Sequence, residues 1–91
     1  MGYYVYILEC ADGKRYYGCT GDLSKRLAEH QQGESCWTAS RRPVKLVYHE
    51  TCETLAQARQ RERSLKNGRM RRKVIDRMIA EFPPEELAPF A

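Results

Sequence analysis

The sequence predicts a small α+β domain with a three-stranded, mainly antiparallel sheet flanked by helices, in the order strand, strand, helix, strand, helix, helix. Three observations lead to this prediction. Two short runs of strand-forming residues flank the Asp12–Gly13 pair, which is a strong signal for a β-hairpin turn. A third alternating run lies further along the chain, and three amphipathic segments carry residues typical of helix termini. The 91 residues suffice for one domain.

The first hairpin, residues 3–19, contains five of the six tyrosines. Because side chains alternate along a strand, Tyr4 and Tyr6 share one face of the first run, and Tyr16 and Gly18 share a face of the second. This pattern places a cluster of tyrosines beside a bare glycine. Aromatic residues that simply pack a small core would give the same pattern, so the hairpin alone indicates no function.

Residues 20–33 predict a helix whose apolar side carries Leu23 and Leu27. Thr20 or Asp22 can cap its start, and the glycine at position 33 can close it.

Arg26 and His30 lie four residues apart on this helix, on a face that borders the leucines. We therefore expect both side chains at the edge of the core. An arginine beside an imidazole can bind a phosphate and move a proton. A solvated arginine and a satisfied surface histidine are the structural alternative.

Residues 33–43 are expected to form a loop, because glycine, serines and a proline punctuate them. Trp37, Arg41 and Arg42 combine an aromatic ring with two cations in this loop. Such a combination suits stacking on bases and contact with phosphates, which makes these residues candidates for substrate binding. The alternative is that Trp37 packs on the core.

Residues 44–52 alternate well enough to predict the third strand, with Val44, Leu46 and Tyr48 on one face. His49 lies on the other face, and we expect it to be structural or exposed.

The helix expected over residues 54–68 carries a carboxylate in its apolar stripe. Leu55, Ala58 and Leu65 form the stripe, and the position that completes it holds Glu62. Burying an unpaired carboxylate costs several kcal/mol. Glu62 is therefore expected to pair with an arginine or to hold a metal ion.

A last amphipathic helix is expected over residues 70–82, with a basic first turn. The basic residues either contact a nucleic-acid backbone or face solvent: Arg69, Arg71, Arg72 and Lys73. Pro83 and Pro84 end this helix. We therefore expect one domain over residues 1–82 and a short, partly mobile tail over residues 83–91.

The composition narrows the classes of function. A formal charge of +4 suggests an anionic partner, although it can equally serve solubility. The four cysteines lack C-x-x-C spacing and there are two histidines, which argues against a zinc site and a disulfide framework; the cysteines are expected to be buried or half-buried. No apolar run approaches the ~20 residues that span a bilayer, and no signal peptide is evident, so we expect a cytoplasmic protein with no membrane contact.

Taken in order, these features resemble the GIY-YIG nuclease domain. The runs at residues 4–6 and 16–18 are about ten residues apart and precede a helix with Arg26 and His30. The A-x-x-x-E-R-S-L-K run at residues 58–66 resembles the metal-binding helix of that family. From Tyr3 to about Lys73 the chain is similar to the small stand-alone GIY-YIG proteins of bacteria.

The resemblance implies a metal-dependent DNA endonuclease, structure-selective or non-specific, that hydrolyses phosphodiester bonds. Tyr6 and Tyr16 match the active-site tyrosines, one of which would deprotonate the attacking water. Arg26 would neutralise the charge of the transition state, and His30 would orient the base or take part in proton transfer. Glu62 matches the carboxylate that holds one Mg²⁺ or Mn²⁺.

Further expectations concern the substrate. Gly18 would give the phosphate close access to the backbone, and Lys66 is an additional candidate contact. Tyr4 and Tyr17 depart from the usual glycine and small aliphatic residue of the family. We expect DNA as the partner, as a branched, flapped or nicked duplex, a monomer or weak homodimer, and a role in DNA repair or recombination. A catalytically silent nucleic-acid-binding module on the same scaffold is the alternative.

Overall fold

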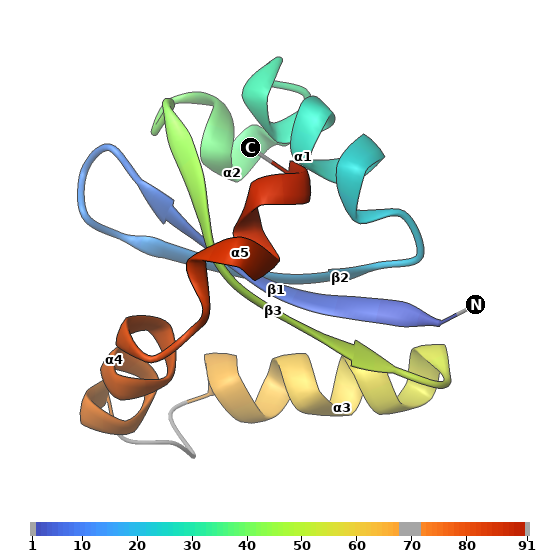
Figure 1. Ribbon diagram of the computed structural model, residues 1–91. Helices are drawn as coiled ribbons and strands as arrows, with labels where there is room; N and C mark the ends of the chain where they lie inside the picture. The colour runs from blue at the N-terminus through green and yellow to red at the C-terminus, as the bar shows by residue number, and fades with distance from the viewer. Residues whose placement is uncertain (1, 68–71, 91) are drawn as a thin grey trace.

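An antiparallel sheet with the strand order β2-β1-β3 separates two layers of helices in the computed structural model (Figure 1). The structure describes residues 2–67 and 72–90. The elements, in chain order, are β1 (Tyr3–Cys10), β2 (Arg15–Thr20), α1 (Leu23–Gln31), α2 (Cys36–Ala39), β3 (Val44–Cys52), α3 (Leu55–Lys66), α4 (Arg72–Ala80), α5 (Pro84–Leu87) and η1 (Ala88–Phe90). The predicted fold class and the order of its main elements are confirmed. The structure adds the short α2 and the C-terminal turns.

The predicted turn joins β1 to β2. Gly13 has φ +83°, a left-handed conformation that favours glycine, and its N–H donates to the carbonyl of Cys10 at 2.9 Å. The Asp12 carboxylate accepts from the N–H of Lys14 at 3.0 Å. The turn sets the pairing of the two strands, in which Tyr6 lies opposite Gly18.

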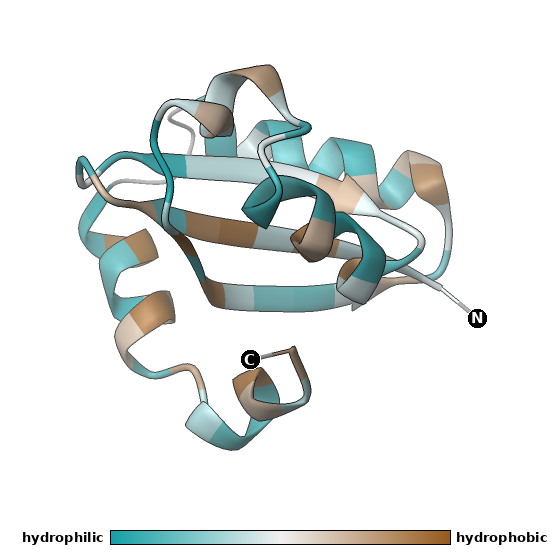
Figure 2. Cartoon of the chain, turned by 90° about the horizontal axis from the view of Figure 1, so that it is seen from above, coloured by the Kyte–Doolittle hydropathy of each residue, from teal (hydrophilic) through white to brown (hydrophobic). Residues whose placement is uncertain are grey.

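Because β1 is the central strand, it is buried on both faces, and each face has its own hydrophobic cluster. Figure 2 shows this hydrophobic central strand between more hydrophilic outer strands. On the side of α1 the cluster consists of Tyr6, Leu8, Cys10, Leu23, Leu27, Val44 and Leu46. On the side of α3 and α4 it consists of Val5, Ile7, Val47, Ala58, Leu65 and Ile75.

A β-bulge in β3 corrects one prediction. The register changes between Ile7, which pairs with Tyr48, and Leu8, which pairs with Leu46, so Val47 is an extra residue on β3. Val47 and Tyr48 consequently both pack with the cluster on the α3 side. The expected shared face of Leu46 and Tyr48 is therefore wrong.

The helix termini follow the predicted capping residues. The Asp22 carboxylate accepts from the N–H of Lys25 at 3.1 Å and caps α1, and Gly33, with φ +80°, follows its last turn. Thr54 and Gln57 form a reciprocal capping box at the start of α3. These caps fix where the two helices that carry the candidate site begin.

The expected loop over residues 33–43 is wrong in one respect, because it contains the one-turn helix α2. A helix of four residues is too short to produce a recognisable hydrophobic period. Its first residue, Cys36, is exposed, contrary to the expectation that the cysteines are buried or half-buried. Cys10 is buried, Cys19 and Cys52 are half-buried, and all four thiols are free.

The C-terminal segment folds back over the α1 side of the sheet (Figure 1). Leu87 and Phe90 pack against the cluster on that side. His49 donates from Nε2 to the backbone carbonyl of Glu86 at 2.8 Å and packs edge-on against Phe90, which gives it the expected structural role. Residues 84–90, expected to be a partly mobile tail, thus close one end of the core.

The described part of helix α4 spans Arg72–Ala80, with Arg72 and Lys73 exposed and Ile75 buried. Arg69 and Arg71 lie outside the described residues. Across the described parts of the chain, the helices are too short or too polar to span a membrane.

Candidate active site

Tyr6 lies at the centre of the sheet with its side chain directed toward α1. The residue is 1% exposed, and its hydroxyl hydrogen-bonds to Nε2 of His30 at 3.0 Å. Its ring lies against Gly18, where a Cβ atom would be 2.5 Å from the phenol oxygen. The absence of a side chain at Gly18 therefore makes room for the phenol of Tyr6. We had instead predicted that this glycine lets a phosphate approach the backbone.

His30 is completely buried, deeper than the predicted edge of the core. Its second ring nitrogen, Nδ1, lies 2.8 Å from the hydroxyl of Thr38, and that hydroxyl donates to the carbonyl of Ser35 at 3.4 Å. Because the Thr38 proton goes to Ser35, we assign the imidazole proton to Nδ1, which donates to Thr38. Nε2 is then the acceptor for the hydroxyl of Tyr6. The alternative of a surface histidine is wrong.

The two titratable members of this hydrogen-bond chain, His30 and Tyr6, are uncharged at neutral pH. Burial lowers the pKa of His30 to about 4, and the nearby cation of Arg26 acts in the same direction. Burial also raises the pKa of Tyr6; the neighbouring Tyr16 adds to the rise, and a hydrogen bond from Arg26 opposes it. Tyr6 is therefore a proton donor in this chain at pH 7.

The low pKa of His30 predicts a loss of stability in mild acid. An unfolded histidine has a pKa of about 6.5, so below that pH the unfolded state binds more protons than the folded state. We expect the free energy of unfolding to be independent of His30 above pH 6.5 and to fall between pH 6.5 and about 4, by up to about 3 kcal/mol. Urea unfolding at several pH values measures this loss.

His30→Gln is the control, since it removes the titrating ring and should flatten the curve in that window. A parent and a variant that lose equal free energy between pH 6.5 and 5 would refute the assignment.

Arg26 lies at the edge of the core, as predicted. Its side chain is 33% exposed and its Nη1 pairs with the carboxylate of Glu29 at 3.0 Å. The guanidinium also interacts with the hydroxyls of Tyr6 and Tyr16. It thus places a positive charge beside both phenols, and the exposed part of its guanidinium can contact an anion from solvent.

Tyr16 is half-buried and is the more accessible of the two tyrosines. Its ring lies between two other aromatic groups: the ring centroid of His30 is 4.8 Å away and that of Trp37 is 5.7 Å away, the latter with an interplanar angle of 30°. The ring of Tyr6 is 6.2 Å away. The predicted cluster of Tyr6, Tyr16, Arg26 and His30 is therefore brought together in one place.

Trp37 is 39% exposed and packs on Tyr16 beside the core. Arg41 lies 4.2 Å above its ring, donates to its backbone carbonyl and pairs with Asp12 at 3.2 Å. Arg42 donates to backbone carbonyls at the ends of α2 and α1, at 2.9 and 3.3 Å. The two arginines therefore attach α2 to the hairpin turn and to α1, and the exposed part of Trp37 borders Tyr16.

Glu62 approaches the site from the other face of the sheet. It is half-buried on α3, beside the thiol of Cys19, whose pKa is raised by burial and by this carboxylate. Cys19 directly follows Gly18 on β2, so Glu62 reaches the same stretch of this strand from the opposite side. Within residues 2–67 and 72–90 no arginine or lysine forms an ion pair with Glu62.

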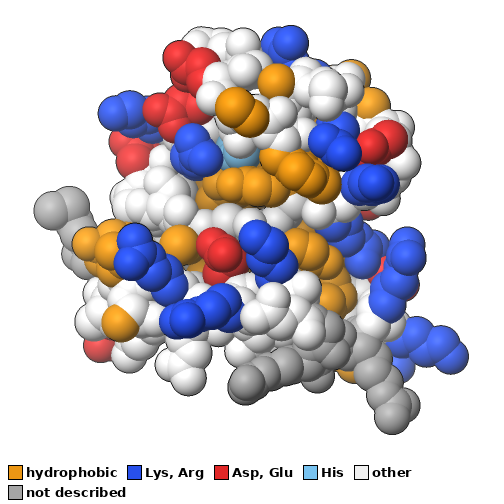
Figure 3. All heavy atoms as spheres, turned by 180° about the vertical axis from the view of Figure 1, so that it is seen from behind, with side chains coloured by type: hydrophobic (Ala, Val, Ile, Leu, Met, Phe, Trp, Pro, Cys, Tyr) orange, Lys and Arg blue, Asp and Glu red, His pale blue; other side chains and the backbone are white. Residues whose placement is uncertain are grey.

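Strand β2 forms one edge of the sheet and separates these two groups of side chains. Figure 3 shows the molecule from this side. Hydrophobic and basic side chains gather above and below the strip of backbone, and a carboxylate lies between basic groups in the lower layer. The site is therefore an open surface around a strand edge.

Glu62 offers a metal ion a single carboxylate. Among the described residues, no three histidine, cysteine or acidic side chains lie close enough together to share a metal ion. A single carboxylate with several retained waters is what Mg²⁺ prefers.

Of the remaining residues near the site, Lys66 was predicted from the sequence and Thr38 was not. Lys66 ends α3 and is exposed, four residues beyond Glu62. Thr38 was missed: it is fully buried and orients His30, yet it lies eight residues away in a segment without periodicity. No signal in a single sequence could have singled it out.

The chain belongs to the GIY-YIG family, since the model of the GIY-YIG catalytic domain matches residues 2–76. Among its relatives is a UPF0213 protein of Bacillus pumilus, 44% identical over 94% of this chain and 87% of that protein. A UPF0213 protein of Staphylococcus saprophyticus is 38% identical over 87% of this chain and 95% of that protein. The predicted family and the likeness to small bacterial members are confirmed.

A solved structure shows the same fold. The solution NMR structure of the UPF0213 protein BH0048 from Bacillus halodurans superposes with a TM-score of 0.58 at 31% sequence identity. The match covers 97% of this chain and 94% of that one. Similarity therefore extends beyond the family domain to the C-terminal turns.

Proposed function

We propose that this protein is a metal-dependent endonuclease that hydrolyses phosphodiester bonds in DNA. One observation carries the proposal: two tyrosines, an arginine and a buried histidine lie on one side of the edge strand β2, and a half-buried carboxylate without a described ion-pair partner lies on the other. Membership in the GIY-YIG catalytic domain family supports DNA as the substrate.

The geometry favours Tyr16 over Tyr6 as the group that takes a proton from water. Tyr6 is buried and its hydroxyl donates a hydrogen bond to Nε2 of His30, so it is poorly placed to meet a water nucleophile. Tyr16 is only half-buried, so its hydroxyl is the more accessible of the two, and the guanidinium of Arg26 lies beside it. Arg26 also neutralises the charge that develops on the phosphate.

The buried residues have positioning roles. Thr38 fixes the tautomer of His30, and His30 holds the hydroxyl of Tyr6. The rings of Tyr6 and His30 form the wall against which Tyr16 packs. The hydrogen-bonded residues Thr38, His30 and Tyr6 therefore keep Tyr16 in place beside Arg26.

Glu62 would hold a single Mg²⁺ or Mn²⁺ through its carboxylate. Such an ion, when bound, would stabilise the negative charge on the leaving 3′ oxygen. We further propose that the open strand edge receives branched, flapped or nicked duplexes. We place the protein in the cytoplasm, in DNA repair or recombination, as a monomer or weak homodimer.

A cleavage screen tests the proposal. Purified protein with Mg²⁺ or Mn²⁺ should nick supercoiled plasmid or cut at least one of a panel of flapped, branched, nicked and intact duplexes, and EDTA should stop the reaction. Gel electrophoresis of end-labelled strands locates the cut. Salt-sensitive DNA binding without cleavage under any divalent ion would instead identify a silent binding module.

A further inference from the structure

Helix α3 carries four basic residues, and they divide into two groups. Arg61 is engaged inside the protein, because its Nε pairs with Glu50 at 2.6 Å and Glu50 also accepts from the hydroxyl of Tyr48. The other three are exposed and pair with no carboxylate in the described ranges: Arg59, Arg63 and Lys66. These three charges are available to an external anion.

Their spacing forms a row beside the candidate metal ligand. Arg59, Arg63 and Lys66 are four and three residues apart, so they follow one side of the helix over about 10 Å. Arg59 lies three residues before Glu62 and Lys66 four after it, which makes both of them neighbours of the carboxylate on the helix surface. Helix α3 packs against β2, and Arg59 acts electrostatically on the thiol of Cys19 on that strand, so the row borders the strand edge.

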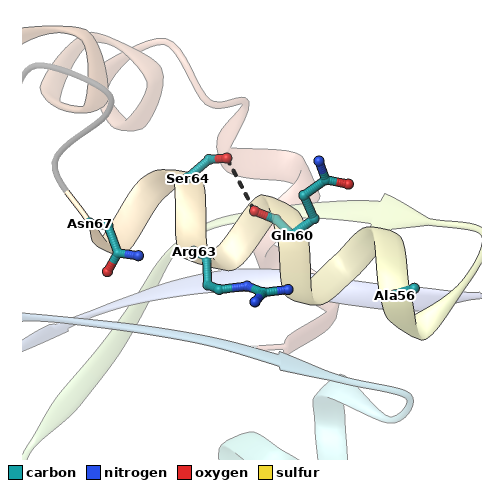
Figure 4. A pocket seen from close by; sticks show the side chains of 5 residues that line it. All are labelled: Ala56, Gln60, Arg63, Ser64 and Asn67. Atoms are coloured by element: carbon teal, nitrogen blue, oxygen red, sulfur yellow. Dashed lines mark hydrogen bonds between the residues drawn. The ribbon is translucent and has the colours of Figure 1, made fainter.

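A polar groove adjoins this row. It has a volume of about 430 Å³ and is lined by Ala56, Gln60, Arg63, Ser64 and Asn67 (Figure 4). Arg63 belongs to both the groove and the row. Amide and hydroxyl groups next to cations, without bulky apolar side chains, suit the sugar-phosphate backbone of a nucleic acid.

We propose that Arg59, Arg63 and Lys66 form a phosphate track that holds one DNA strand along α3 as it passes Glu62. The inference rests on the proposed function and adds the path of the bound strand. Three cations spread over about 10 Å complement the regularly repeated negative charge of one DNA strand. Contacts of this kind position the strand without reading its sequence.

The salt dependence of binding tests the track. Fluorescence anisotropy of a labelled duplex in EDTA, from 25 to 200 mM salt, gives the slope of log K against log salt without any cleavage. Arg59→Gln, Arg63→Gln and Lys66→Gln should each weaken binding and reduce the slope by about 0.9. Lys45→Gln is the matched control, since it removes one exposed charge from β3 at the opposite edge of the sheet and should leave the slope unchanged.

Each outcome has a distinct meaning. If the parent binds DNA with steep salt dependence but the α3 variants keep its slope, the phosphate track is wrong and the proposed function stands. A parent that neither binds nor cuts any DNA would overturn both. Melting followed by circular dichroism should show that the variants, which change only exposed side chains, are folded.

Discussion

Glu62→Gln is expected to reduce metal-dependent DNA cleavage by about 10³-fold or more while leaving the fold intact. The amide has nearly the shape of the carboxylate but lacks the charge that holds a hard cation. Glu62 forms no ion pair with a described residue, so the substitution removes no salt bridge known to stabilise the structure. Single-turnover cleavage of the best substrate from the panel measures the loss.

A second readout separates metal binding from other causes. Binding of Mn²⁺, followed by the loss of its free electron-paramagnetic-resonance signal, should weaken in the same variant. Glu81→Gln is the control, because Glu81 is an exposed carboxylate at the end of α4 and its loss should change neither measurement. Full cleavage by Glu62→Gln would show that the carboxylate has been given the wrong role.

Gly18→Ala is expected to destabilise the fold by about 2 kcal/mol, which lowers the melting temperature by roughly 10 °C in a domain of this size. The added Cβ would lie 2.5 Å from the oxygen and 2.6 Å from the Cζ atom of Tyr6. The phenol cannot move aside freely, because it is buried and bonded to His30. Thermal and urea unfolding measure the effect.

Gly21→Ala provides a matched control three residues after Gly18. A Cβ there would meet its nearest neighbour, the ring of Tyr3, at 3.5 Å, an ordinary contact. This variant should melt close to the parent. Equal melting temperatures for both alanine variants would mean that the tight packing of Tyr6 on Gly18 contributes nothing to stability.

The parts of the fold that depend on local chemistry could be predicted from the sequence. The Asp12–Gly13 turn and the caps at Asp22 and Thr54 depend on residues close together in the chain, where propensity and hydrogen bonding decide the outcome. Glu62 could be found because it interrupts an apolar helix stripe, a contrast visible without coordinates.

The parts that depend on tertiary contacts could not be predicted. Strict alternation of side chains assumes that a strand has no extra residue, so it does not reveal the bulge at Val47. Tyr48 was therefore assigned to the wrong face of the sheet. The depth of His30 is set by Thr38 and by the phenol of Tyr6, which come from separate elements. The division between structural Arg61 and exposed Arg63 likewise depends on Glu50, across the core on β3.

The position of the site at a strand edge also limits how this protein can self-associate. Strand β2 pairs only with β1 in the described structure, so its outer backbone groups are free to accept another strand. A second chain added there would cover the space between Tyr16 and Glu62. If the protein is the nuclease proposed above, strand addition at β2 would block its site, and a homodimer active on DNA would have to assemble through a different surface.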